Sequence, residues 1–125
     1  MNFVDGSLDL AGPAAVLQTR AGTRIPLPGL KATASLAGDQ RPVVLGVRAE
    51  HIHVVPMDTP ASTTGRVLVE ELAGADTYLL ADVGGHELTI RTSTGEHIRR
   101  GESLPIRIDG GAASLFCPAS GRRLN

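Results

Sequence analysis

Aromatic side chains and lysines are nearly absent from this sequence. Aromatic residues make up 2% of the 125 residues, tryptophan is missing, and Lys31 is the one lysine. The formal net charge is −1. Nucleic-acid binding needs clustered cations for the phosphates and usually aromatic platforms for the bases. We therefore expect no nucleic-acid partner, and a core built from Val, Leu, Ile and Ala.

Cysteine and long apolar runs are equally scarce. Cys117 is the single cysteine, so no internal disulfide can form, which fits a reducing cytoplasm. The default interpretation of such a thiol is a small buried side chain. No apolar run approaches the length of a membrane span, and no signal-peptide pattern is present. These absences predict a cytoplasmic chain.

The motifs of common enzyme classes are also missing. The phosphate-cradling G-x-x-x-x-G-K-[ST] loop is absent, since no glycine directly precedes Lys31. Neither a G-x-S-x-G elbow nor an H-E-x-x-H helix occurs. Glu70 and Glu71 are adjacent on a predicted strand, so they face opposite sides and cannot form a paired-carboxylate site by themselves. We expect no catalytic residue and no cofactor site.

Histidine spacing offers a weak metal signal. His51 and His53 would point the same way on a strand and could share a metal with His86 or His97. A change of strand phase at this point would separate the two rings. The default interpretation is a pair of partly exposed polar histidines, so we expect no metal site.

Glycine and proline are what the sequence has in quantity, with fifteen and eight residues. They favour turns and short strands over long helices. Residues 31–37 could form one helical turn or a loop, residues 57–64 read as a connection, and Gly74-Ala75-Asp76 reads as a turn. The count is about eight to ten strands with little helix. We predict a single all-β domain over 1–125, an OB-fold-like small barrel or β-sandwich.

The clearest hairpin joins residues 77–83 to residues 86–92. Gly84-Gly85 lies between them, and glycine pairs suit the positive φ angles of two-residue turns. This turn predicts that Leu79 lies opposite Ile90 and that Tyr78 lies opposite Arg91.

The stretch from Val43 to Pro56 is the centre of the chain. Its apolar residues keep one parity up to Ala49 and then change phase, which predicts a bend at about Glu50-His51. Arg48 and Glu50 are expected to share a strand face just before the bend. They either form a local polar pair or contact another domain or subunit.

This central stretch carries a family resemblance. The run from Leu45 to Ile52, LGVRAEHI, resembles the L-G-I-R-P-E-H segment of the C-terminal regulatory domain of sugar-importer ABC ATPases. Ala49 stands where that family usually has proline, and Cys117 stands in place of an aspartate, so capping of the last turn by that aspartate is expected to be lost. Similar blocks follow the family's order along the chain: Met1-Asn2-Phe3 with Gly6, the run from Glu71 to Asp76, Gly101 with Leu104, and the run from Leu115 to Leu124.

The resemblance implies a transport-associated OB (TOBE) module of a maltose-type or glycerol-3-phosphate-type importer. Such a module follows the nucleotide-binding domain, which alone would hold ATP and Mg²⁺. It pairs with its copy in the second ATPase subunit, docks regulatory proteins, and meets the membrane permease only indirectly. Our candidates for intersubunit or regulator contacts are Arg48, Glu50, Glu71, Gly74 and Asp76.

A small-ligand module is the alternative. Related transport-associated domains bind oxyanions such as molybdate, which would require backbone N–H groups and hydroxyls at a subunit interface. The candidate hydroxyls, which also read as ordinary loop polarity, are those of Thr63, Thr64, Thr92, Ser93 and Thr94.

Overall fold

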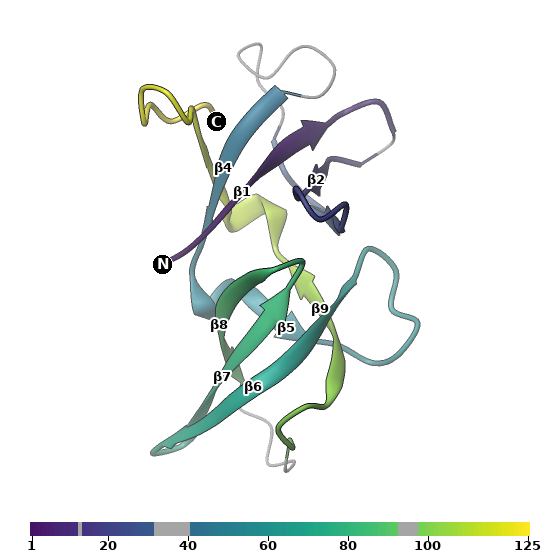
Figure 1. Cartoon of the computed structure of the whole chain (residues 1–125), viewed down its shortest axis with the longest axis vertical. Coiled ribbons are helices and arrows are strands. Elements are labelled where there is room, and N and C mark those ends of the chain that lie inside the picture. Colours follow the sequence, from purple (N-terminus) through teal and green to yellow (C-terminus); the bar gives the residue numbers. More distant parts are fainter. Residues whose placement is uncertain (13, 32–40, 93–97) are drawn as a thin grey trace.

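The computed structural model describes residues 1–12, 14–31, 41–92 and 98–125. Within these ranges ten strands form two five-stranded antiparallel sheets, one above the other in Figure 1, and two short 3₁₀ helices connect strands of the two sheets. None of the helices in these ranges has the length and apolar character that a membrane crossing requires. The predicted all-β fold with little helix is confirmed. The predicted turn or loop over residues 31–37 falls outside these ranges, apart from Lys31.

The first sheet joins segments from both ends of the chain. Its strand order is β10-β4-β1-β2-β3, so β4 pairs with the first strand and with the last one. Gln18 to Arg24 is a short hairpin, and Gly22 in its turn has a φ of 85°. The strands are β1 (Asn2–Asp9), β2 (Val16–Gln18), β3 (Arg24–Pro26), β4 (Arg41–Val47) and β10 (Ser114–Phe116).

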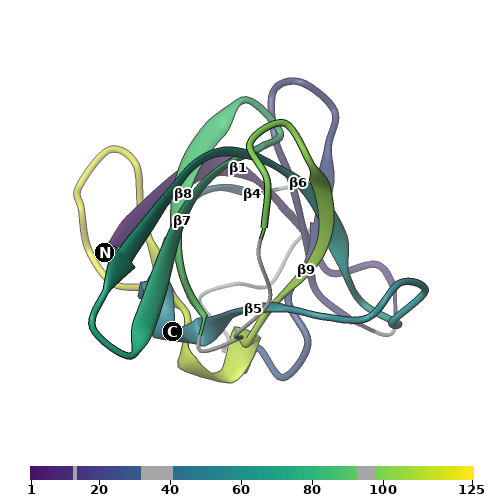
Figure 2. The same cartoon turned by 90° about the horizontal axis from the view of Figure 1, so that it is seen from below.

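The second sheet consists largely of neighbouring hairpins. Its order is β5-β9-β6-β7-β8, and it curls so that the edge strands β5 and β8 come into contact (Figure 2). β6 begins at Thr63, within the segment predicted as a connection. The strands are β5 (Ile52–Val54), β6 (Thr63–Ala73), β7 (Asp76–Val83), β8 (His86–Thr92) and β9 (Ser103–Ile108).

The predicted register of the β7–β8 hairpin is confirmed. Leu79 lies opposite Ile90, and Tyr78 lies opposite Arg91. Gly84 and Gly85 have φ angles of 60° and 86°, which L-residues with a Cβ rarely adopt. The glycine pair therefore sets the turn, and the turn sets which side chains enter the core.

The predicted bend is a 3₁₀ helix, η2 (Ala49–His51), between the two sheets. The His51 backbone N–H donates to the Arg48 carbonyl over 3.0 Å, and the strand resumes at Ile52, which is fully buried. The turn of the 3₁₀ helix allows the chain to leave one sheet and enter the other while Val47 and Ile52 both reach the core.

The core is aliphatic, as predicted. Its buried residues form one cluster that contains side chains from both sheets, and no aromatic residue belongs to the part of it that the structure describes. The largest fully buried side chains are Leu8, Leu17, Ile25, Leu27, Leu45, Ile52, Leu79, Leu88, Ile90, Ile106 and Ile108.

Among the described residues, two hydrogen-bonded contacts outside the core lie where the two sheets meet. The Asn2 side-chain amide donates to the Thr89 carbonyl and accepts from the Thr89 N–H, each over 2.8 Å. On the other side, the Gly110 N–H, in the 3₁₀ helix η3 (Gly110–Ala112), donates to the Pro28 carbonyl over 2.8 Å. Asn2 thus forms hydrogen bonds with both backbone polar groups of Thr89 on the edge strand β8. This gives the asparagine of the M-N-F motif a structural role.

Candidate functional site

Glu50 lies against the second sheet. Its Oε2 is 3.6 Å from Arg91 Nη1 on β8, and its Oε1 is 3.7 Å from His51 Nε2. About 40% of each partner in the Arg91 pair is exposed, so the pair contributes roughly 0–1 kcal/mol to stability. The contact orients Glu50 more than it stabilises the fold.

The strand register extends this pair into a row of polar side chains. Glu71 on β6 lies opposite Tyr78 on β7, which lies opposite Arg91 on β8. Residues opposite one another in a ladder share a face of the sheet. We call Glu50, Arg91, Tyr78 and Glu71 the charged row. It crosses the face opposite to the one that carries Leu79 into the core.

The end of the β6–β7 hairpin projects past the neighbouring strand (Figure 1). Residues 71–75 are all exposed, and we call them the hairpin tip. Gly74 lies in its turn with a φ of 65°, and Asp76 pairs with Ala73 as the first residue of β7. Leu72 is 75% exposed. The tip therefore exposes one apolar side chain next in sequence to the carboxylate of Glu71.

Arg48 does not join this group, and the predicted strand face shared with Glu50 is wrong. Arg48 is the residue before η2, with extended backbone, and Glu50 lies inside the 3₁₀ helix. Among the described residues, Glu50 forms an ion pair with Arg91 and lies 3.7 Å from His51 Nε2. The structure thus brings Glu50 and Glu71 to the charged row, and Gly74 and Asp76 to the hairpin tip or beside it, while Arg48 stays exposed on its own.

Sequence reasoning missed Arg91 and Leu72 as members of this surface. The predicted register already placed Arg91 beside Tyr78, but nothing local indicates that η2 folds over β8. Leu72 has the same parity as Leu79 across the hairpin, so its pattern indicates burial; it is exposed because the strand extends past the core.

The histidines are spread over different elements. His51 lies in η2, His53 lies on β5 opposite Arg107, and His86 begins β8. In the ranges that the structure describes, no three His, Cys, Asp or Glu side chains are grouped as metal ligands. His97 lies outside those ranges.

The described hydroxyls of the small-ligand alternative do not come together in one site. Thr63 and Thr64 begin β6, whereas Thr92 ends β8 beside Thr77, at the opposite end of the sheet. Thr92 is buried. Ser93 and Thr94 lie outside the described residues.

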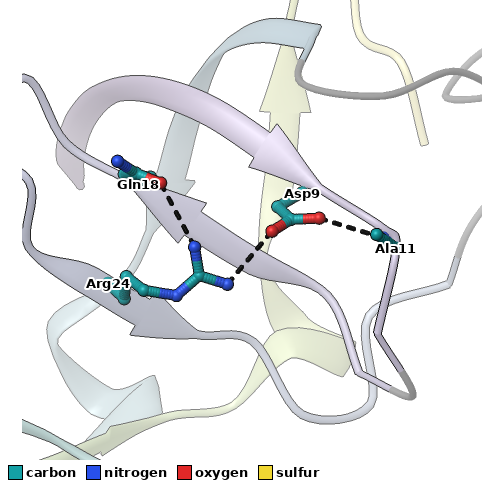
Figure 3. Close-up of polar contacts among 4 residues, drawn as sticks. All are labelled: Asp9, Ala11, Gln18 and Arg24. Atoms are coloured by element: carbon teal, nitrogen blue, oxygen red, sulfur yellow. Dashed lines mark hydrogen bonds and ion pairs between the residues drawn. The ribbon is translucent and has the colours of Figure 1, made fainter.

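The first sheet carries a separate polar network (Figure 3). Arg24 donates from Nη2 to Asp9 Oδ2 over 3.1 Å and from Nη1 to Gln18 Oε1 over 3.2 Å. The Ala11 backbone N–H, which donates to Asp9 Oδ1, and the Arg24 guanidinium hold the pKa of Asp9 below its ordinary value of 3.8. A cavity of about 480 Å³ adjoins this network and is lined in part by Asp5, Ser7 and Thr19.

Comparisons with known proteins match the chain to two domain families and to part of the length of longer proteins. The family model described as the MalK OB fold domain matches residues 1–52, and the one described as the TOBE domain matches residues 45–116. The ABC transporter ATP-binding protein YcjV of Escherichia coli K12 is 33% identical over 109 residues, 87% of this chain and 29% of that protein. The sn-glycerol-3-phosphate import ATP-binding protein UgpC of Burkholderia mallei is 32% identical over 123 residues, 98% of this chain and 33% of that protein.

The chain thus spans about a third of the length of the curated relatives it matches. Among solved structures, the cytoplasmic molybdate-binding protein ModG, crystallised with molybdate bound, superposes with a TM-score of 0.70. It is 18% identical, and the match covers 94% of this chain and 96% of that one. This likeness is one of fold.

Proposed function

The chain belongs to the TOBE domain family, and from this we propose that it is the C-terminal regulatory domain of the ATP-binding subunit of an ABC importer for sugars or glycerol phosphates. The observation that carries the proposal is the ordered match of two family models, MalK OB fold and then TOBE, across almost the whole chain. Relatives named as ABC transporter ATP-binding proteins support it.

In this proposal the domain has no catalytic role of its own. The sequence lacks the glycine-rich lysine loop that cradles phosphates, so ATP and Mg²⁺ would bind to the nucleotide-binding domain of the same subunit. The subunit would lie in the cytoplasm, on the inner face of the membrane, and would contact the permease through that other domain.

The domain's task would be to pair with its copy in the second subunit. A tether raises the effective concentration of one nucleotide-binding domain near the other without adding a contact at the ATP site. The two ATPase domains could then open and close while the two subunits stay associated.

The second sheet supplies the surface that suits pairing best. Burying Leu72 of the hairpin tip would contribute about 1.5–3 kcal/mol, whereas an exposed ion pair contributes roughly 0–1 kcal/mol. Leu72 would therefore provide most of the affinity. Glu50 and Glu71 of the charged row lie on the face of the sheet opposite to Leu72, so the partner would have to contact both faces of the hairpin. These two carboxylates, with Asp76 beside the tip, would set the orientation. Arg48, exposed beside η2, is proposed as a contact for the partner copy or a regulatory protein.

Sedimentation equilibrium over a wide concentration range tests this proposal. We expect a dimer whose dissociation constant rises at least tenfold in Leu72→Ser and severalfold in Glu71→Arg and Glu50→Arg. The matched control is Arg20→Glu, an exposed charge reversal in the β2–β3 loop of the first sheet, which should leave the constant within twofold.

Arg48→Glu separates the two roles proposed for that residue. A weaker dimer would assign Arg48 to the pairing surface, and an unchanged dimer would leave it to a regulator. The pairing proposal fails if the chain stays monomeric at millimolar concentration, or if Arg20→Glu weakens the dimer as much as Leu72→Ser does.

Small-ligand binding is a second candidate, favoured by the fold shared with ModG and by the polar cavity beside Asp9. The ligand would be an oxyanion such as molybdate, or a sugar. Thermal unfolding with molybdate, tungstate, maltose and glycerol 3-phosphate tests it, because a ligand of the native state raises the unfolding temperature in a concentration-dependent way. A midpoint that stays constant with all four would reject this candidate.

A further inference from the structure

A pocket lined by arginines lies at the far end of the first sheet from the second one. Its cavity of about 410 Å³ lies where β4 begins and where the chain turns after β10. Figure 1 shows this turn as the yellow loop near the C-terminus. The described lining residues are Arg41, Cys117, Ser120, Arg122, Arg123 and Leu124. None of the residues singled out from the sequence as contact sites belongs to it.

The described lining of the pocket is rich in arginine. Three of its six described lining residues are arginines and none is an acid. Within the described part of the chain, no carboxylate lies within ion-pair distance of Arg122 or Arg123, although acids pair with Arg24 and Arg91 elsewhere. Two or more guanidinium groups around one cavity create a local field that attracts anions.

The surroundings of the Cys117 thiol also favour a negative charge, chiefly through hydrogen bonds. Hydrogen bonds from the Ser120 hydroxyl and from the backbone N–H groups of Ser120 and Ala119, together with the positive charge of Arg41, hold the pKa of Cys117 below its ordinary value of 9.0. Each of these groups favours a negative charge in the pocket. The turn thus keeps an acceptor at the position where the family resemblance has an aspartate.

The loop that presents the arginines is held in place by backbone hydrogen bonds. The Cys117 N–H donates to the Arg122 carbonyl and the Gly121 N–H donates to the Cys117 carbonyl, each over 2.8 Å. Gly121 has a φ of 71°, which favours glycine. Beyond the loop, Asn125 accepts from the Leu115 N–H over 2.9 Å and donates to the Ala113 carbonyl over 3.1 Å. The rim of the pocket is therefore formed before any ligand arrives.

We propose that this arginine pocket binds the phosphate group of a small soluble phosphate or phosphate monoester. The planar guanidinium matches two phosphate oxygens at once, which makes arginine the preferred side chain for this group. A cavity of about 410 Å³ has room for a phosphate with a short organic chain. The inference does not depend on pairing through the second sheet.

Titration with inorganic phosphate, at ionic strength held constant with chloride, tests the site. We expect saturable changes in the amide NMR signals of Cys117, Gly121 and Arg122, with signals of the second sheet unmoved. Alkylation of Cys117 by iodoacetamide, a neutral reagent, should slow in parallel, because a bound phosphate covers the thiol. Glycerol 3-phosphate should give the same pattern.

Matched variants decide whether the arginines carry the binding. Arg122→Gln and Arg123→Gln should each raise the dissociation constant for phosphate at least fivefold, and the double variant more. Cys117→Asp should abolish binding by placing a carboxylate on the same N–H donors. The control Arg107→Gln, at an exposed arginine on β9, should change the constant less than twofold.

Three outcomes would overturn the proposal. The first is a linear response to phosphate that chloride reproduces. The second is an equal loss of binding in Arg107→Gln and Arg122→Gln. The third is binding to phosphatidic acid vesicles, but not to phosphatidylcholine vesicles, without saturation by soluble phosphate, which would make the pocket a site for lipid headgroups.

Discussion

The two sheets of this domain are built from chain segments of different kinds. In the second sheet β6, β7 and β8 follow one another through tight turns, so that neighbours in sequence are neighbours in the sheet. In the first sheet β4 lies between the first strand of the chain and the last. One sheet extends a hairpin tip into solvent, and the other carries an arginine pocket at its far end. Together, the two proposals assign pairing to one sheet and anion binding to the other.

The contrast within the β6–β7 hairpin gives the largest expected effect. Leu79 is fully buried and Leu72 is 75% exposed, although they have the same parity. Leu79→Ala should lower the free energy of unfolding by about 2–5 kcal/mol because it leaves a cavity. Leu72→Ala should change the stability of the monomer by less than about 0.5 kcal/mol. Urea unfolding of dilute protein measures both, and a comparable loss in Leu72→Ala would mean that the tip packs against the core.

Substitution of Gly110, where η3 contacts the segment after β3, is expected to have the second-largest effect on stability. A Cβ added at Gly110 would lie 2.5 Å from the carbonyl oxygens of Leu27 and Pro28, which are backbone atoms that cannot move aside cheaply. Gly110→Ala should therefore cost about 1–3 kcal/mol in urea unfolding. The control is Gly12→Ala, whose Cβ would meet no atom of the described residues closer than 3.9 Å. Equal stability of the two variants would show that the backbone around Gly110 can move to accommodate the added Cβ.

The Asn2 contact, on the other side of the place where the two sheets meet, should contribute less. Asn2→Ala removes two exposed hydrogen bonds to Thr89, with an expected loss of about 1–2 kcal/mol. Asn2→Asp keeps the acceptor for the Thr89 N–H and should lose less. Hydrogen exchange of the Thr89 amide should accelerate in the alanine variant and much less in the aspartate variant. Unchanged exchange in both would contradict the contact.

Removing the carboxylate of Asp9 from the polar network of the first sheet should change stability least, and only at acidic pH. Because the pKa of Asp9 is lowered in the folded state, its contribution to stability is complete above 3.8, the ordinary value, and is lost as pH falls through the lower folded value. Asp9→Asn should therefore flatten the decline of the unfolding free energy below about pH 4. The unfolding free energy of both proteins is measured by urea unfolding at a series of pH values. If it declines in parallel in the original chain and in Asp9→Asn, Asp9 does not have this role.

Features that local sequence patterns determine could be predicted from the sequence, and most of them lie in the second sheet and at the bend that leads to it. The β7–β8 register was predictable residue by residue because Gly84-Gly85 fixes the turn and strand parity fixes the rest. The bend at Glu50 was predictable from the change of phase, but its 3₁₀ form was not, so the strand face assigned to Arg48 and Glu50 was wrong.

Contacts between distant segments left no local signal in the sequence. The Glu50–Arg91 pair joins residues that lie 41 positions apart, and the arginine pocket joins the start of β4 to the last turn of the chain. Arg122 and Arg123 alone indicate only a charged end of the chain. The sequence does not indicate that they line a pocket together with Arg41. The topology of the first sheet brings Arg41 beside them.

The measurement that tests the division of roles between the two sheets most directly is amide hydrogen exchange of the whole chain at low and at high protein concentration. The division predicts that concentration protects amides of the hairpin tip and of β8 near Arg91, while amides of β10 and the turn after it exchange at the same rate throughout. Protection of β10 and that turn on self-association, or dimerisation with no protection at the hairpin tip, would contradict it.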